Sequence, residues 1–207
     1  MTASWYDRHI LPWALDIACG LRAVERQRRK VVPLAHGRVL EVGIGTGLNM
    51  AWYDPVRVSR ITGLDPALDL HPRAQRRIEA AGLPVELVGL SAEQIPRPDA
   101  SFDTVVVTYT LCTIPDPVAA LREMRRVLVP GGRLLFCEHG RAPDAGVACW
   151  QDRLQPLWGP LAGGCHLNRD IPALLQAGGF VCPDLQTRYL PGPRVMTFNY
   201  WGQALAA

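Results

Sequence analysis

The 207-residue sequence has no long uninterrupted apolar stretch and no strong excess of charge of either sign. Asp7, Arg8, His9 and Asp16 interrupt the first 21 residues. This stretch therefore has neither the cationic start and apolar block of a signal peptide nor the roughly 20 apolar residues of a membrane span. A formal net charge of +3 is too small to indicate a nucleic-acid partner. We expect a cytoplasmic protein without a transmembrane segment, and peripheral membrane contact stays open.

The cysteines lack any regular spacing. No C-x-x-C pair is present, which argues against a zinc site, and the scattered positions argue against a disulfide framework. We therefore expect no bound metal and a reducing compartment. The six cysteines are Cys19, Cys112, Cys137, Cys149, Cys165 and Cys182.

Internal repeats, low-complexity tracts and linkers are absent as well. A chain of this length with 48% hydrophobic residues is expected to form one domain with a sizeable core. Positive charge gathers locally at residues 22–30, on a predicted helix. We interpret this run as a solvated helix face, with a surface for an acidic partner or anionic lipid as the alternative.

From residue 38 onward, strand-like and helix-like segments alternate. This alternation predicts an α/β fold with a mainly parallel sheet covered by helices on both faces. Asp116 and Asp170 are typical N-cap residues of two of the helices. The last two strands are joined by a connection too short for a parallel crossover, so they should pair antiparallel. The seven predicted strands are residues 38–42, 60–65, 85–89, 103–108, 133–138, 180–190 and 197–206.

A glycine-rich stretch, EVGIGTG, follows the first predicted strand, at the position where α/β proteins bind ligands. Gly43, Gly45 and Gly47 read G-x-G-x-G, and Leu48 stands where a nicotinamide-binding fingerprint has its third glycine. The carboxylate of Glu41, just ahead of the glycines, would repel a pyrophosphate but suits an ammonium and a sulfonium. The pattern therefore predicts a cradle for a cationic ligand.

Four further motifs follow in order, GLDP, SAEQIP, FDTVVVTYTLCTIPD and LVPGGRLLFCEH. Together with EVGIGTG they resemble the class I S-adenosylmethionine-dependent methyltransferases, and the resemblance extends from residue 38 to the C-terminus. It implies a Rossmann-like, doubly wound sheet of seven mainly parallel strands with an antiparallel last strand and helices on both faces. It also implies methyl transfer from S-adenosyl-L-methionine.

The resemblance implies a set of cofactor-binding residues. The glycine loop and Glu41 would surround the methionine part of S-adenosyl-L-methionine, and Asp65 would bind the ribose hydroxyls. Thr108 and Tyr109 would face the transferred methyl group, while the loops after the second and third strands would enclose the adenine. The implied residues are Glu41, Gly43, Gly45, Gly47, Asp65, Pro66, Ala67, Ser91, Ala92, Glu93, Thr108 and Tyr109.

The segment after the fifth predicted strand contains an E-H, a W-Q, a P-x-W and a G-C followed by an arginine. In these motifs it resembles the alkyl thiol S-methyltransferases, and it also resembles bacterial phospholipid N-methyltransferases. The first family implies a small thiol as methyl acceptor, and the second implies an amine or a phospholipid headgroup. A domain that binds the cofactor without turnover is the remaining alternative. A neighbouring imidazole can accept the proton of a thiol or favour the thiolate. His139, His166 and Tyr109 are the predicted catalytic residues.

The structural alternatives for these side chains are simple packing roles. His139 could bind a backbone carbonyl at the end of the sheet, and Cys165 could be a small buried hydrophobic residue. Within the single domain we expect a helical lid at residues 1–35, a cofactor-binding half at 38–140 and an acceptor-pocket half at 141–207. Residues 5–21 could instead pack as an ordinary N-terminal helix, without covering the pocket.

Overall fold

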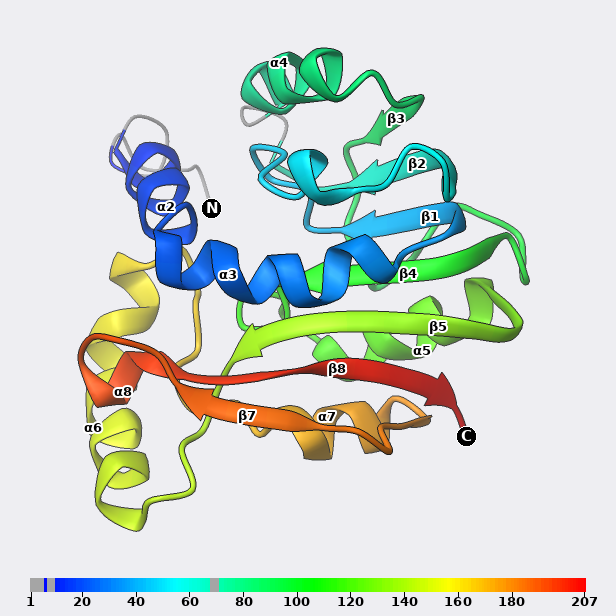
Figure 1. Ribbon diagram of the computed structural model, residues 1–207. Helices are drawn as coiled ribbons and strands as arrows, with labels where there is room; N and C mark the ends of the chain where they lie inside the picture. Colours follow the sequence, from blue (N-terminus) through cyan, green and yellow to red (C-terminus); the bar gives the residue numbers. More distant parts are fainter. Residues whose placement is uncertain (1–5, 7–9, 68–70) are drawn as a thin grey trace.

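The computed structural model describes residue 6 and residues 10–67 and 71–207. The beginning of the expected lid therefore lies outside the described residues. One sheet runs through the molecule in the order β3-β2-β1-β4-β5-β8-β6, and β7 also pairs with β8 (Figure 1). The strands are β1 Gly37–Val42, β2 Val58–Leu64, β3 Val85–Val88, β4 Phe102–Thr108, β5 Leu128–His139, β6 Phe180–Val181, β7 Gln186–Tyr189 and β8 Phe198–Ala206.

The pairing of the strands confirms the predicted topology. Strands β1 to β5 pair parallel with one another, whereas β8 is antiparallel to β5 and to both β6 and β7. The chain moves outward from β1 to β2 and β3, then returns to place β4 on the other side of β1. This reversal separates the loops that follow β1 and β4, and such a point is where open α/β sheets bind ligands.

Two strands differ from their predicted extents. The segment predicted as one strand at 180–190 forms β6 and β7, with a break at residues 182–185. Pro183 lies in this break and cannot donate a backbone hydrogen bond to a sheet. Strand β5 begins at Leu128, ahead of the predicted start, and its register with β4 shifts across the Pro130-Gly131-Gly132 turn, where Gly131 has a φ of +79°.

Helices cover both faces of the sheet, as predicted. Two begin at the expected caps, since Asp116 accepts a hydrogen bond from Ala119 N–H at 2.9 Å and Asp170 accepts one from Ala173 N–H at 3.1 Å. No helix in the described part of the chain is long and apolar enough to cross a bilayer. The helices are α2 Leu11–Cys19, α3 Arg22–Val31, η1 Val32–Leu34, η2 Met50–Trp52, α4 His71–Ala81, α5 Pro117–Val127, α6 Ala145–Leu161, α7 Ile171–Ala177 and α8 Arg194–Thr197.

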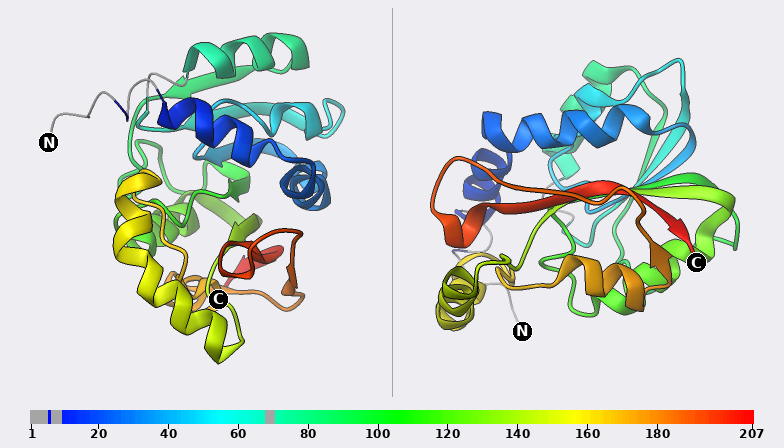
Figure 2. Two further views of the ribbon diagram at one scale, coloured as in Figure 1. Left: turned by 90° about the vertical axis from the view of Figure 1, so that its left-hand side faces the viewer. Right: turned by 60° about the horizontal axis from the view of Figure 1, so that its bottom comes forward.

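The alternation of side chains along β4 divides the core between the two faces of the sheet. Val105 and Val107 pack in one cluster with α5 and α7, whereas Val106 packs in the other cluster with residues of α3 and α4. Figure 2 shows α3 on one side of the sheet and α5 and α7 on the other. Helices α2 and α6 lie at the edge where the parallel strands end, so they cover the predicted ligand site (Figure 1).

The position of Met124 in the core predicts that its truncation lowers the stability of the fold strongly. This side chain is 0% exposed on the inner face of α5, whereas Arg122 on the same helix is exposed. We expect Met124→Ala to lower the free energy of unfolding by about 2–5 kcal/mol, because buried methylenes are lost and a cavity is left. Urea unfolding measures this change. Arg122→Ala is the control, and an equal loss in both variants would contradict the packing assignment.

Candidate active site

The three predicted loop glycines all have left-handed backbones, with φ of +74° at Gly43, +52° at Gly45 and +79° at Gly47. A methyl group at Gly43 would overlap the Thr110 side chain, and one at Gly47 would come within 3.2 Å of the Ala74 Cα. At Gly45 the nearest protein atoms would be 3.9 Å away. The outer two glycines are therefore required by packing, whereas Gly45 borders space that a ligand can fill.

Asp65 joins the glycine loop to the loop after β2. Its side chain accepts hydrogen bonds from the backbone N–H of Gly45 at 2.9 Å and of Ala67 at 2.8 Å, and its residue is 9% exposed. The following Pro66 and Ala67 are exposed. A carboxylate held at this edge, next to exposed backbone, suits the hydroxyl pair of a ribose.

The predicted adenine loop after β3 lies next to this edge. Asp65 N–H donates to the Val88 carbonyl at 3.0 Å, which brings the ends of β2 and β3 together. Ala92 is buried, and Glu93 accepts a hydrogen bond from Ser91 and one from Asp116 N–H at 3.2 Å. Glu93 thereby fixes the loop after β3 to the start of α5. The predicted adenine residues thus lie on adjacent loops.

Glu41 is buried beneath the glycine loop and 1% exposed. Its two carboxylate oxygens accept hydrogen bonds from Asn49 Nδ2 at 2.9 Å and from the Tyr53 hydroxyl at 2.8 Å. Burial raises the pKa of this carboxyl to about 7, against the opposing effect of these two donors. Protein side chains thus already engage both oxygens, and contact of Glu41 with a ligand ammonium stays a prediction.

Arg28 enters the site from α3, which the sequence did not predict. The charged run at 22–30 was interpreted as a solvated helix face, but Arg28 is only 5% exposed. Its Nη1 donates to Asn49 Oδ1 at 3.0 Å and to Thr108 Oγ1 at 2.5 Å, and its guanidinium lies 5.1 Å from the Tyr109 ring centroid. One signal in the sequence could have indicated this burial. Arg28 lies three residues before the apolar Val31, so both lie on the buried side of α3.

The Nε of Arg28 is buried without a hydrogen-bond partner among the described residues. A buried donor of this kind needs an acceptor, and a carboxylate is the acceptor that arginine binds best. S-adenosyl-L-methionine carries such a carboxylate on its methionine part. The open side of Gly45 and this unsatisfied donor are the two features of the structure that fit the cofactor.

A second group of side chains lies where β4 and β5 end. Tyr109 has a left-handed backbone, with φ of +54°, and its hydroxyl donates to Asn199 Oδ1 at 2.7 Å. Glu138 is 0% exposed, and its Oε1 accepts hydrogen bonds from the N–H groups of Thr110 at 2.8 Å and Leu111 at 3.1 Å. Burial raises the pKa of Glu138 to about 7. Glu138 therefore fixes the turn after β4, a role that sequence reasoning missed.

His139 contacts a sulfur atom rather than a backbone carbonyl. Its Nε2 lies 3.3 Å from Cys165 Sγ, and Cys112 Sγ completes a group whose three atoms lie within 4.8 Å of one another. Cys165 thus has a polar partner in addition to its packing. The predicted His166 turns to the backbone, since its N–H donates to the Cys112 carbonyl at 2.9 Å and its Nδ1 lies 3.1 Å from the same oxygen.

The sulfur–imidazole group shifts the ionisation of its members. Hydrogen bonds from Cys112 and then His139 lower the pKa of Cys165, against the effect of burial. The hydrogen bond between Cys112 and Cys165, together with burial, raises the pKa of Cys112. Of the two cysteines, Cys165 is therefore the one that ionises first. Burial lowers the pKa of His139, but the contact with Cys165 outweighs it and the net shift is upward. Arg169, bonded to the Leu111 carbonyl, adds positive charge nearby.

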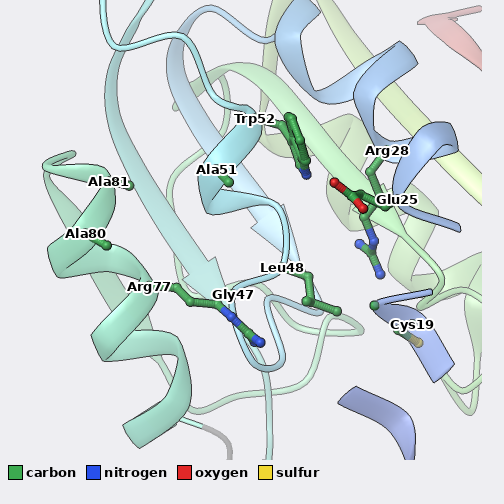
Figure 3. A pocket seen from close by; sticks show the side chains of 11 residues that line it. Cys19, Glu25, Arg28, Gly47, Leu48, Ala51, Trp52, Arg77, Ala80 and Ala81 are labelled. Atoms are coloured by element: carbon green, nitrogen blue, oxygen red, sulfur yellow. The ribbon is translucent and has the colours of Figure 1, made fainter. Parts of the chain in front are cut away.

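A cavity of about 320 Å³ lies behind the glycine loop, between α3 and α4 (Figure 3). Arg28 and Glu25 line it from α3, Arg77 lines it from α4, and Leu48 points into the space between them. Asp65 is not part of its lining. This cavity adjoins the candidate site at Arg28 but is not the predicted ribose pocket.

Comparisons with known proteins agree with this geometry. The family described as "Methyltransferase domain" matches residues 40–136. The human protein "Thiol S-methyltransferase TMT1B" is 36% identical over 174 residues, which are 77% of this chain and 66% of that protein. "Phosphatidylethanolamine N-methyltransferase" of Cereibacter sphaeroides is 38% identical over 132 residues, which are 61% of this chain and 64% of that protein. The chain therefore spans slightly less than two thirds of the length of these relatives.

A solved structure supports the fold. It is described as a SAM-dependent methyltransferase and possible histamine N-methyltransferase from Thermotoga maritima. It has a TM-score of 0.68 at 21% identity and covers 98% of each chain. The sheet order and the glycine loop thus define a Rossmann-like methyltransferase fold. The chain belongs to the S-adenosylmethionine-dependent methyltransferases, and S-adenosyl-L-methionine is its cofactor.

The space beside Gly45 predicts a selective effect on cofactor binding. We expect Gly45→Ala to keep the fold, at a strain of about 1 kcal/mol for a left-handed alanine, and to weaken cofactor binding by about 1–3 kcal/mol because the methyl group fills ligand space. Gly82→Ala is a matched control, since Gly82 has a φ of +66° and nothing within 4 Å of an added Cβ. Calorimetry with S-adenosylhomocysteine measures binding. Equal affinities in the two variants would show that the loop is only a turn.

Glu41 predicts a pH dependence of stability. Its pKa is about 7 in the folded protein against an ordinary value of 4.5, so folding favours the protonated form. This contribution is fully present below pH 4.5 and is lost as the pH rises through 7. Ionisation of Glu41 should therefore lower the free energy of unfolding by up to about 3 kcal/mol as the pH rises. Glu41→Gln cannot ionise, so we expect this part of the decrease to be absent in the variant. Urea unfolding across this range tests it, and parallel profiles would refute it.

Proposed function

We propose that this protein transfers the methyl group of S-adenosyl-L-methionine to a small thiol. The observation that carries the proposal is the contact of 3.3 Å between His139 Nε2 and Cys165 Sγ, at the edge where β4 and β5 end. Acceptors bind beyond this edge in α/β sheets. An imidazole beside sulfur favours a thiolate over a thiol, and the thiolate is the nucleophile. A site that already stabilises one sulfur in this way suits a second sulfur as acceptor.

The reaction needs alignment and the loss of one proton. The cofactor supplies an electrophilic methyl group on a positively charged sulfur. The acceptor thiol gives its proton to the His139 imidazole or to solvent, and its sulfur forms a bond to the methyl carbon while the bond from that carbon to the cofactor sulfur breaks. The products are a methyl thioether and neutral S-adenosylhomocysteine. The protein's contribution is to exclude water and hold the two sulfur atoms in line with the methyl carbon.

The described side chains divide this work between two groups. The glycine loop, Asp65 and the loop at 91–93 are proposed to hold the cofactor, with Arg28 Nε directed to its carboxylate. Thr108, which accepts a hydrogen bond from Arg28, and Tyr109, where the chain turns after β4, are proposed to face the transferred methyl group. His139 is proposed to favour the thiolate of the acceptor, and His166 to border the acceptor.

The N-terminal helices are proposed to act as the lid of this site. Asp16 on α2 accepts a hydrogen bond from Thr46 of the glycine loop and forms an ion pair with Arg77 at 2.8 Å. The Tyr6 hydroxyl donates to the Leu161 carbonyl of α6 at 2.9 Å. These contacts connect α2 with the glycine loop and with α4, and connect Tyr6, ahead of α2, with α6. A lid of this kind excludes water from the methyl transfer.

An amine acceptor on a phospholipid is the second candidate. The Cereibacter relative is named for such a reaction. Large apolar side chains are exposed on α2, among them Trp13 at 59% and Ile17 at 48%, and on α6, where Leu157 is 69% and Leu161 62% exposed. Both helices lie at the carboxyl edge of the sheet (Figure 1). An apolar rim at this edge suits the approach of a lipid.

The proposed thiol methylation predicts which acceptors are methylated and how the substitution of His139 changes turnover. We expect alkyl and aryl thiols to be methylated, and ethanolamine lipids and simple amines not to be. His139→Ala should lower kcat on the best thiol by about 100-fold or more while cofactor affinity stays unchanged, because only the acceptor loses its partner. Formation of S-adenosylhomocysteine measures turnover in each case.

The exposed His36 gives the matched control, and His36→Ala should keep full activity. Methylation of phosphatidylethanolamine vesicles without methylation of thiols would favour the second candidate. Cofactor binding without turnover on any of these acceptors would instead indicate a binding domain. Full thiol turnover by His139→Ala would remove His139 from its proposed role.

A further inference from the structure

Three soft donor atoms meet in the acceptor half although they are far apart in the sequence. Cys112 follows β4, His139 ends β5, and Cys165 follows α6. Their two sulfur atoms and one ring nitrogen lie within 4.8 Å of one another, and the contact from His139 to Cys165 is 3.3 Å. Both cysteines are unbridged, and they are 3% and 8% exposed. The arrangement is therefore a set of two buried thiols and one partly exposed imidazole.

The spacing of these atoms is close to that of metal ligands. Two sulfur ligands about 2.3 Å from a tetrahedral ion lie about 3.8 Å apart, and a sulfur and a nitrogen ligand lie slightly closer. The observed separations, 3.3 Å for one pair and no more than 4.8 Å for any pair, bracket these values. Shifts of about 1 Å or less, within the reach of a side-chain rotation, would bring all three atoms into coordination.

The backbone around the three residues is fixed before any ion binds. The N–H of His166 donates to the Cys112 carbonyl at 2.9 Å, which ties the two cysteine segments directly to each other. Gln155 Nε2 donates to the Cys165 carbonyl at 3.0 Å. Glu138 holds the turn that precedes Cys112. A site assembled in this way loses little conformational entropy on binding.

The surroundings suit a neutral metal complex. Cys112 and Cys165 pack with Ala162 and Trp158 in a small apolar cluster. Two thiolates and one neutral imidazole around a divalent ion carry no net charge, so such a complex can be buried there without an uncompensated charge. Thiolate and imidazole donors select zinc and related soft ions over magnesium or calcium.

From these observations we infer that Cys112, His139 and Cys165 form a binding site for one Zn²⁺ ion or a similar soft divalent ion. Three protein ligands leave the fourth tetrahedral position open, as in catalytic zinc sites. An exogenous thiol is the ligand that this position would take, because coordination deprotonates a thiol. This last part rests on the proposed function, since it assigns the acceptor sulfur to the open position.

Cobalt binding tests the site without reference to activity. The reduced full-length protein, stripped with a chelator, is titrated with Co²⁺, whose absorption reports tetrahedral geometry and sulfur ligation, and Zn²⁺ is then added in competition. We expect one ion per chain, with sulfur-to-cobalt charge transfer that Zn²⁺ removes. Cys112→Ser and Cys165→Ser should each weaken binding by more than about 100-fold, since even outer-shell partners contribute about 10- to 100-fold.

Cys149→Ser is the control because Cys149 is exposed on α6, outside the group, and it should bind like the unmodified protein. Alkylation of the unmodified protein provides a second measurement that needs no variant. Zn²⁺ should protect Cys112 and Cys165 from iodoacetamide and leave Cys149 reactive. Absence of a tetrahedral cobalt spectrum, unchanged binding in both serine variants, or no selective protection would each overturn the site.

Addition of an alkyl thiol to the cobalt protein tests the open position. Stronger charge transfer on addition supports coordination of the acceptor sulfur, and an unchanged spectrum overturns that part while the three-ligand site stands. Because these spectra are recorded without the cofactor, their outcome is separate from that of the methylation assay. A bound ion in a protein that methylates no thiol would remove the proposed function and leave the metal site.

Discussion

The buried carboxylate of Glu41 is the constraint on which the cofactor half depends. A carboxylate removed from water needs hydrogen-bond donors, and Asn49 and Tyr53 supply them. The Asn49 carbonyl then accepts from Arg28, whose guanidinium also reaches Thr108. This chain of bonds connects β1, the glycine loop, β4 and the N-terminal helix α3. Helix α3 and the glycine loop are therefore parts of one polar network.

A second buried carboxylate plays the corresponding part at the end of β5. Glu138 binds the backbone N–H groups of Thr110 and Leu111, and it thereby fixes the turn that begins at the left-handed Tyr109. This turn carries Cys112 toward His139 and Cys165. The two carboxylates thus organise two groups of side chains, the first around the glycine loop and the second around the sulfur atoms. The parallel strands end at one edge of the sheet, and both groups lie at that edge.

Local signals in the sequence predicted most of the fold because strong local rules determine it. Capping aspartates, alternating strands and the short last connection were each sufficient to place an element and its direction. The predictions were wrong where a local rule competes with sheet geometry. Pro183 divides the predicted strand at 180–190, and the turn at Gly131 is incorporated into β5 as a register shift. The interpretation of residues 22–30 as a solvated face was wrong for Arg28, since composition does not reveal which side of a helix a charge occupies.

The sequence by itself determined the alternation of strands and helices, the glycine loop and the carboxylates that follow or end the strands, and the resemblance of these motifs indicated the family and its cofactor. These features follow from neighbours in the chain, so local patterns are sufficient to find them. Only the tertiary structure decided that Arg28 faces Thr108 and that Cys112, His139 and Cys165 converge. The absence of a C-x-x-C pair argued against such a group of donors, because sequence patterns detect only ligands that share one loop. Three separate chain segments brought to one sheet edge leave no such pattern.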